Sequence, residues 1–279
     1  MSPRSLLAFG VPALVIAAAC DSPPPAGPPP PPAATMVAPP PIPAPPPVAS
    51  AAAPPTPAPE PPPAAKPPPC GAGMALVPGG ALKAYGPKKE EAKVDAFCMD
   101  VSETTAEEYA ACVKTGKCND VQSKCAAQAT YGVADLAKHP MVCVDFAQAN
   151  TYCETQGKRL PADEEWELAA RGPEGRKYPW GDAEPKEQLC WSGASPHKGT
   201  CAVGSVAAGD TPQGIHDLAG GVYEFTTSKN DAKAKVRIGR GGSWKDGTAQ
   251  LVGSARPAAF GVTYRCGFLG IRCVAKPAP

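Results

Sequence analysis

A tract rich in proline and alanine, residues 21–69, limits where this chain of 279 residues can fold. The tract holds 25 of the 39 prolines, and its charged residues are Asp21, Glu60 and Lys66. Proline and alanine bury too little apolar surface to offset the entropy lost on folding, so we expect a disordered tether. Folding is therefore expected in residues 70–279, whose charges nearly cancel and favour no nucleic-acid partner.

The first twenty residues have the pattern of an export signal. Arg4 precedes an apolar run from Leu6 to Ala19, which is too short to span a bilayer comfortably. Three alanines lead directly into Cys20, as in a bacterial lipoprotein signal. This resemblance implies cleavage before Cys20, acylation of that residue, and a lipid anchor on the periplasmic or cell-surface side of the bacterial envelope. An ordinary secretory signal with an incidental cysteine is the alternative.

Eleven cysteines follow Cys20, in a chain whose export would let disulfides persist. No two have the C-x-x-C spacing of a zinc ribbon or a thioredoxin-like site. We therefore expect several disulfides and, because the number is odd, one remaining thiol. The expected local pairs are Cys190 with Cys201 and two of Cys112, Cys118 and Cys125, and the candidates for the remaining thiol are Cys143 and Cys266.

Local patterns predict three helices and several short strands. Thr105 and Glu108 have capping-box spacing and predict a helix over 105–116, and Gly157 ends a second helix over 145–157. Pro161 can begin a short third helix within 157–172. Two strands around a Pro-Gly-Gly turn are expected to pair as a hairpin over 74–86, and further strands are expected over 235–239 and 268–275. The fold class is α+β, loop-rich and stabilised by disulfides.

A series of motifs in order is more specific than any one of them. They read "FCMDVSETTAEEYAACV" (97–113), "CVDFAQANTYC" (143–153), "GKRLPADEEWELAARG" (157–172), "YPWGD" (178–182), "GIHDLAGGVYEF" (214–225), "RGGSW" (240–244) and "GIRC" (270–273). Together they resemble the formylglycine-generating enzyme, or sulfatase-modifying factor, family. The resemblance implies a C-type-lectin-like fold with long loops and a central twisted antiparallel sheet.

The resemblance also implies where catalysis would occur. In the oxidase members two cysteines follow the "G-G-S-[YW]" turn, bind copper, and use oxygen to convert a substrate cysteine into formylglycine. Asp246 and Leu251 stand at those two positions here, and no cysteine lies between Cys201 and Cys266. A carboxylate is a hard ligand, unsuited to copper(I), and a leucine is no ligand. We expect neither copper binding nor formylglycine-generating activity.

The resemblance implies one calcium site, and the residues argue against two further metal sites of the family. Calcium in the family is bound by residues that match Asp217, Gly220, Val222 and Glu224, where carboxylate and carbonyl oxygens converge on a tight turn. The alternative is that Asp217 caps the turn and that Glu224 pairs with an arginine, either Arg256 or Arg272. The second calcium site of the family is not expected, because 188–193 has no asparagine. A histidine iron site is not expected either, since His139, His197 and His216 lack i, i+4 spacing.

Structural residues are implied in the same way. The resemblance pairs Cys153 with Cys273, which closes a loop of about 120 residues and restricts the unfolded chain by roughly 4–5 kcal/mol. The residues expected to hold the core without taking part in chemistry are Arg159, Trp166, Glu167, Trp180 and Arg240. Ala162 replaces the threonine that is usual before the third helix, and a lost helix cap costs about 1 kcal/mol.

Three functions are compatible with these features. The first is a non-catalytic protein that binds a peptide or glycan at a cleft formed by Ser243, Trp244 and Asp246. The second is a formylglycine-generating or related metal-dependent oxidase with a relocated site, using the remaining thiol. The third is an accessory or structural envelope protein without a small ligand. The missing cysteine pair favours the non-catalytic readings.

Overall fold

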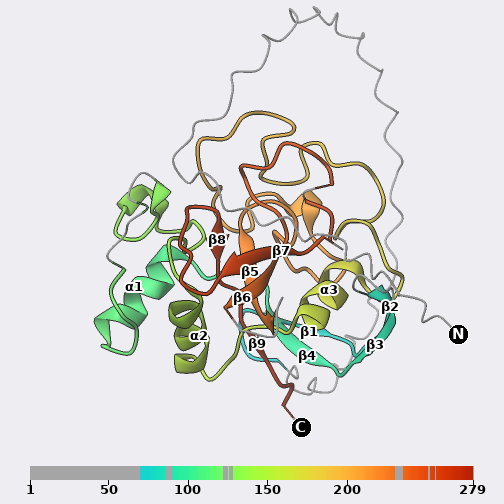
Figure 1. Ribbon diagram of the computed structural model, residues 1–279, viewed down its shortest axis with the longest axis horizontal. Coiled ribbons are helices and arrows are strands. Elements are labelled where there is room, and N and C mark those ends of the chain that lie inside the picture. The colour runs from blue at the N-terminus through green and yellow to red at the C-terminus, as the bar shows by residue number, and fades with distance from the viewer. Residues whose placement is uncertain are drawn as a thin grey trace, which may run out of the picture. The chain divides into compact units, whose positions relative to one another are not determined.

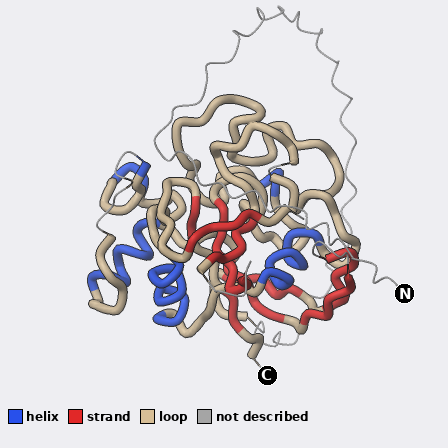
Figure 2. The backbone as a smooth tube through the Cα atoms, viewed as in Figure 1, coloured by secondary structure: helices blue, strands red, loops and turns tan. Residues whose placement is uncertain are grey.

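The computed structural model describes residues 70–85, 90–121, 125, 128–229, 235–250, 252–254 and 256–278. The expected signal, Cys20 and the proline-rich tether lie outside these residues. No helix in the described part has both the length and the apolar composition needed to cross a membrane. Long loops account for much of the described chain, and 172–222 contains no helix or strand except the short 3-10 helix η3 (Ala207–Gly209) (Figure 2).

The three predicted helices are present, and local hydrogen bonds explain where they begin. α1 (Ala106–Lys114) starts at the predicted capping box, in which Thr105 and Glu108 bond to each other's backbone N–H. α2 (Phe146–Thr155) starts in the same way at Asp145. α3 (Asp163–Arg171) follows Ala162, which has no side-chain acceptor, as the sequence predicts. A further short 3-10 helix, η2 (Ala134–Leu136), lies between α1 and α2.

A four-stranded sheet lies at the centre of the described fold (Figure 1). Its order is β7 (Ala258–Gly261), β6 (Val236–Arg240), β5 (Tyr223–Lys229) and β8 (Leu269–Gly270). β5, β6 and β7 are antiparallel, whereas β8 is parallel to β5. α3 contacts β5 and β6, and buried residues of α1 and α2 belong to the same apolar cluster as Tyr223 and Phe225 of β5.

The predicted hairpin over 74–86 is wrong in its pairing. β1 (Met74–Val77) and β2 (Gly80–Tyr85) do exist, but they belong to different sheets. β1 pairs with β4 (Phe97–Asp100), and β2 pairs with β3 (Glu90–Val94). The connection at Gly79 runs so close to the start of the β3–β4 connection that a Cβ there would lie 2.6 Å from Ala96 N. A local turn signal cannot reveal which distant strand becomes the partner.

The single strand expected over 268–275 is also wrong. The segment forms β8 in the central sheet and β9 (Val274–Ala275), which pairs with β4 in the three-stranded sheet. Between the two strands, Ile271 O and Cys273 O accept from Thr104 N–H and Asp100 N–H. This break places Arg272, whose side chain is fully buried, in the polar interior described below.

Five disulfides cross-link the described fold. They include Cys153–Cys273 and Cys190–Cys201, the two bridges predicted in the sequence analysis. The five are Cys70–Cys98, Cys112–Cys118, Cys125–Cys143, Cys153–Cys273 and Cys190–Cys201. Cys143 is therefore bridged, and Cys266 is the buried cysteine outside the five bonds. Cys153–Cys273 joins α2 to the segment before β9 across 120 residues, which makes it the bridge with the largest effect on the unfolded chain.

Candidate functional site

The glycine-rich turn after β6 is held inside the fold. Gly241 has φ +101°, a backbone conformation that L side chains rarely adopt, and a Cβ there would lie 3.3 Å from Trp166. Trp244 N–H donates to Gly221 O at 2.7 Å, so this turn is joined to the loop that precedes β5. Two of the motifs found in the sequence therefore meet at one place in the fold.

Ser243 and Trp244 do not form the walls of an open cleft. Trp244 is buried, and its indole N–H donates to Gly267 O at 2.8 Å. Ser243 is also buried, and its hydroxyl donates to Asp246 Oδ2 at 3.0 Å. The prediction that these two side chains face a ligand is therefore wrong. Their polar atoms are used inside the protein, because a turn this close to the core must satisfy its own hydrogen bonds.

Asp246, at the first of the two cysteine positions of the oxidases, is largely enclosed. Burial raises the pKa of its carboxyl group above the ordinary value of 3.8, although the bond from Ser243 opposes that shift. Its backbone carbonyl accepts from Ser192 N–H at 2.9 Å. Leu251, at the second cysteine position, lies outside the described residues. At Asp246 the fold thus offers a partly buried oxygen group instead of a soft thiolate.

A cysteine–histidine group lies beside this turn. The ligand atoms of Cys190, His197 and Cys201 all lie within 4.8 Å of one another, and Ser192 bonds both to His197 N–H and to Trp244 O. The two sulfur atoms are bonded to each other, so the bridge removes both thiolates that a metal would need. In the described part of the chain no other group of three His, Cys, Asp or Glu ligand atoms is this compact.

One buried arginine network anchors α3 to the sheet. Arg240 of β6 bonds to both carboxylate oxygens of Asp163 at 2.5 and 2.6 Å, and its Nη2 lies 2.9 Å from Glu167. Glu167 also pairs with Arg171 at 2.6 Å. These contacts agree with the expected structural role of Glu167 and Arg240, to which the fully buried Trp166 also belongs.

Two of the expected core residues are not in the core. Arg159 pairs with Glu165, but its side chain is 43% exposed. Trp180 is partly exposed, and its ring stacks on Tyr178 with a centroid distance of 5.0 Å. Both side chains lie nearer the surface and contact partners close in sequence, Glu165 of α3 and the buried Tyr178.

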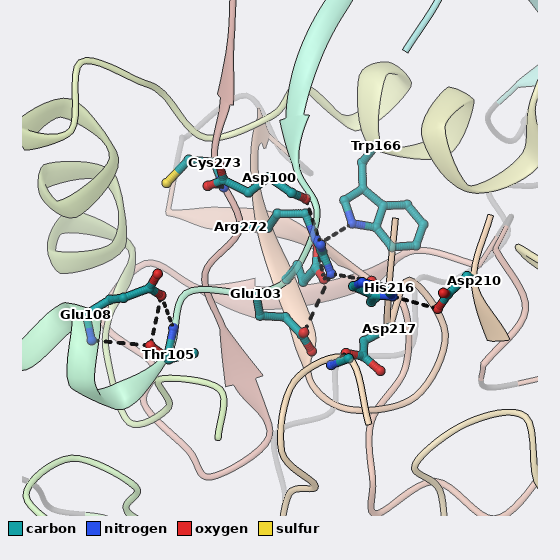
Figure 3. A network of polar contacts seen from close by, with 12 residues as sticks. Asp100, Glu103, Thr105, Glu108, Trp166, Asp210, His216, Asp217, Arg272 and Cys273 are labelled. Atoms are coloured by element: carbon teal, nitrogen blue, oxygen red, sulfur yellow. Dashed lines mark hydrogen bonds and ion pairs between the residues drawn. The ribbon is translucent and has the colours of Figure 1, made fainter. Parts of the chain in front are cut away.

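A second buried network surrounds Arg272 (Figure 3). Its guanidinium donates to both carboxylate oxygens of Glu224, at 2.8–3.0 Å. Trp166 Nε1 donates to the same carboxylate at 2.6 Å. Further Arg272 bonds reach the carbonyl oxygens of Asp100 and His216. Glu224 thus has the arginine partner that the sequence analysis left open as an alternative.

The implied calcium ligands fit this arrangement only in part. Asp217 and Gly220 lie in a tight turn with φ +59° and +77°, and Asp217 Oδ2 accepts from Gly204 N–H at 2.6 Å. Glu224 is already bonded to Arg272 and Trp166, which leaves it poorly placed to bind an ion. Glu103 differs, because neither of its buried carboxylate oxygens accepts a hydrogen bond. The turn therefore keeps Asp217 and Gly220 of the implied ligand set, whereas the carboxylate of Glu224 is engaged elsewhere.

Sequence reasoning did not single out Glu103. The available signal was its place in the first motif, where it is the glutamate of the pattern "F-x-x-D-x-x-E-V-T". Burial, and then the negative charge of Asp217, raise the pKa of Glu103 well above its ordinary value. Only the folded chain brings these two acids together, since they are far apart in sequence.

Comparisons with known proteins show which proteins this chain is similar to. Residues 58–277 match the family described as "Sulfatase-modifying factor enzyme 1-like domain". The chain is 40% identical over 161 residues to "Inactive C-alpha-formylglycine-generating enzyme 2" of Bos taurus, covering 51% of this chain and 52% of that protein. It is 37% identical over 107 residues to "Formylglycine-generating enzyme" of Mycobacterium tuberculosis, covering 35% and 36%. The chain thus spans about half the length, or less, of these curated relatives.

Solved structures show the same fold at lower identity. PvdO from Pseudomonas aeruginosa superposes with a TM-score of 0.60 at 21% identity, covering 76% of this chain and all of that one. Treponema denticola variable protein 1 gives 0.57 at 18%, covering 73% and 95%. These likenesses concern the fold alone. Because the family match extends over most of the chain, and both the motif order and the α+β disulfide-stabilised fold agree with it, the chain belongs to the sulfatase-modifying factor enzyme 1-like domain family.

Proposed function

We propose that this chain is a non-catalytic member of its family, anchored by a lipid at Cys20 on the periplasmic or surface side of a bacterial envelope. The tether would hold the folded domain away from the membrane, where it binds a peptide or glycan. The runner-up is a metal-dependent oxidase with a relocated site. The two proposals differ in whether the chain holds copper(I) and turns over a cysteine-containing peptide.

Asp246 carries this proposal. The oxidase chemistry of the family needs two thiolates at one metal, and a partly buried carboxyl group stands at the position of the first of them. Ser243 donates to that carboxylate, so the group is already part of an internal network. Two relatives, from Bos taurus and Mus musculus, carry the word "inactive" in their names, which is in keeping with a family in which the fold persists without the oxidase reaction.

A hollow lined mainly by residues 185–194 is the candidate ligand site. Its volume is about 640 Å³, and it is lined by Pro185, Lys186, Glu187, Gln188, Trp191, Gly193, Ala194 and Ala208. Ser192, which follows Trp191, bonds to the backbone of Asp246, so this hollow adjoins the former catalytic position. The exposed Lys186 and Glu187 and the amide of Gln188 suit a peptide or sugar that offers polar groups, whereas Trp191 is buried and forms the base of the hollow.

Copper binding and turnover separate the two proposals. The purified chain is incubated with copper(I), oxygen and a cysteine-containing peptide, and the aldehyde product is measured by mass spectrometry. The wild type is expected to hold no stoichiometric copper and to form no aldehyde. The double variant Asp246→Cys/Leu251→Cys is expected to gain copper binding, because it restores both soft ligands. Copper binding with aldehyde formation by the wild type would establish the oxidase.

Ligand binding is tested on peptide and glycan arrays. Lys186→Ala and Glu187→Ala are expected to weaken any saturable binding, while Lys114→Ala, an exposed residue on α1, leaves it unchanged. If no ligand binds, or if all three variants bind like the wild type, the hollow is not the site. The anchor is tested separately, since Cys20→Ala is expected to release the chain from the membrane fraction.

A further inference from the structure

The loop closed by the Cys190–Cys201 bridge carries a histidine that the proposed function does not use. His197 Nδ1 lies 3.8 Å from Cys201 Sγ, and the ligand atoms of Cys190, His197 and Cys201 all lie within 4.8 Å of one another. While the two sulfur atoms are bonded to each other, neither is the thiolate that a metal needs. The fold nevertheless gathers two sulfur atoms and one imidazole nitrogen at one place.

This bridge is approachable from solvent on one side. Cys201 is partly exposed, whereas Cys190 is buried. Between them, residues 193–196 and 198 are exposed, and no helix or strand interrupts the loop. In the described part of the chain both cysteines are buried in three of the four other bridges, and Cys125 is the partly exposed exception. A reductant therefore has access to the Cys201 end of the bridge.

Opening this bridge leaves the rest of the fold cross-linked. Its two cysteines are 11 residues apart in sequence, whereas Cys153 and Cys273 are 120 apart. The restriction that a bridge places on the unfolded chain grows with the loop that it closes. Loss of the Cys190–Cys201 bond is therefore expected to cost less stability than loss of the long-range bridge.

Both ends of the loop are held by contacts other than the bridge. Cys190 O accepts from Gly221 N–H at 2.9 Å, in the turn that precedes β5. Two residues after Cys201, Val203 N–H donates to Lys138 O at 3.0 Å. These backbone hydrogen bonds do not need the S–S bond, so the two sulfur atoms are expected to stay near each other after it opens.

The histidine is positioned in the same way. His197 N–H donates to Ser192 Oγ at 3.1 Å, and the Ser192 hydroxyl donates to Trp244 O at 2.9 Å. The backbone of His197 is thereby tied to the buried turn after β6. Its ring nitrogen remains directed at Cys201 without any contribution from the bridge.

We propose that reduction of the Cys190–Cys201 bridge creates a site for one zinc ion, bound by Cys190, His197 and Cys201. Two thiolates and one imidazole are a ligand set that suits zinc, and three protein ligands leave a fourth position for water. The site differs from the oxidase pair, whose two positions are Asp246 and Leu251. The inference goes beyond the proposed function, because it concerns a metal that only the reduced chain would hold.

The reductant is a dithiol, either a small molecule or a protein. One of its thiolates attacks the partly exposed Cys201 sulfur, the S–S bond breaks, and the Cys190 sulfur leaves as a thiolate. The second thiol of the reductant attacks the mixed disulfide and releases the Cys201 thiolate, so the reductant becomes a disulfide. His197, when protonated at Nδ1, can donate to that thiolate. The two protons of the dithiol pass to solvent as zinc takes both thiolates.

The test begins with the full chain, reduced in steps with a phosphine. Non-reducing peptide mapping identifies the state in which the Cys190–Cys201 bridge is open and the other four described bridges are closed. This state is titrated with Zn²⁺ in a calorimeter and with Co²⁺, whose bonds to thiolates give a charge-transfer absorption. It is expected to bind one ion and to show that absorption, whereas the oxidised chain is expected not to show it. If the bridge cannot be opened while the others stay closed, the proposal is overturned.

Three variants assign the ion to this place. His197→Ala is expected to weaken zinc binding by the reduced chain at least about tenfold, because it removes one ligand and leaves both cysteines. Lys198→Ala, at an exposed position in the same loop, is the matched control and is expected to bind like the wild type. Cys190→Ser/Cys201→Ser is expected to show no cobalt–thiolate absorption.

Three results would overturn the proposal. They are no zinc binding by the reduced wild type, equal affinity of His197→Ala and the wild type, and undiminished zinc binding by Cys190→Ser/Cys201→Ser. If the double variant does not fold, the comparison of His197→Ala with Lys198→Ala decides. Failure here leaves the proposed non-catalytic function standing, because that function is tested by copper binding, peptide turnover and ligand arrays.

Discussion

The two buried arginines in the described part of this protein, Arg240 and Arg272, have different electrostatic surroundings. Arg240 meets Asp163 and Glu167, and Arg171 gives Glu167 a second cation. Arg272 meets Glu224 directly, with Glu103 and Asp217 close by. The two networks are neighbours, since Glu224 lies opposite Arg240 in the β5–β6 ladder and Trp166 of α3 bonds to Glu224.

The two networks differ in how well their charges are balanced. In the Arg240 network two basic residues match two acids, so nothing further is needed to hold α3 against the sheet. In the Arg272 network the acids outnumber the guanidinium, and one carboxylate has no hydrogen bond at all. A buried charge imbalance is costly, which agrees with the raised pKa of Glu103. The predictions below test this contrast, from the largest expected effect to the smallest.

Arg272→Met is expected to have the largest effect on the free energy of unfolding. Removing a buried ion-pair partner costs about 3–5 kcal/mol, and this variant should lie at the upper end because three carboxyl groups lose their only guanidinium. Urea denaturation measures the loss. The additional variant Glu224→Gln should recover part of it. A cost no larger than that of Arg159→Gln, at a partly exposed pair, would contradict the assignment.

Arg240→Met is expected to cost less within the same range of about 3–5 kcal/mol, because Arg171 still pairs with Glu167. Its effect should be the same in chelator and in Ca²⁺, whereas Arg272→Met should be partly rescued by Ca²⁺. Denaturation curves in both conditions compare the two arginines. Equal rescue of both variants would show that the two networks do not differ as described.

Asp246→Asn tests a partly buried acid outside both networks. Burial raises the pKa of Asp246, so the folded state favours its protonated form. This stabilising contribution is present below the ordinary pKa of 3.8 and is lost as the pH rises through the raised pKa. Asparagine does not titrate, so the stability of the variant relative to wild type should increase with pH from about 4 upwards. A flat difference in urea denaturation across this range would refute the prediction.

Ala162→Thr is expected to have the smallest effect, a gain of about 0.5–1 kcal/mol, because it supplies the missing side-chain acceptor at the start of α3. The gain should be independent of Ca²⁺, since α3 begins in the Arg240 network. Ala162→Val serves as the control, because it adds bulk without an acceptor. No difference between the two variants would indicate that the contacts of Asp163 already fix this helix end.

Signals that act within a few residues were sufficient to predict much of this protein from its sequence. The helix starts at Thr105 and Asp145 rest on hydrogen bonds to backbone and side chains three residues away. The Cys190–Cys201 bridge closes a short loop, which chain connectivity favours. The order of the motifs identified the family, and through it the fold and the Cys153–Cys273 bridge.

Contacts between distant segments were decided only by the tertiary structure. β1 and β2, on either side of Gly79, pair with different strands. The expected final strand is two strands, β8 and β9, and Arg272 between them is buried. Trp244, which was expected at a cleft, is buried. Glu103 and Asp217 lie close together although more than a hundred residues separate them in the chain. The physical reason is that local hydrogen bonds set where elements begin, whereas pairing and buried charge depend on which surfaces pack together.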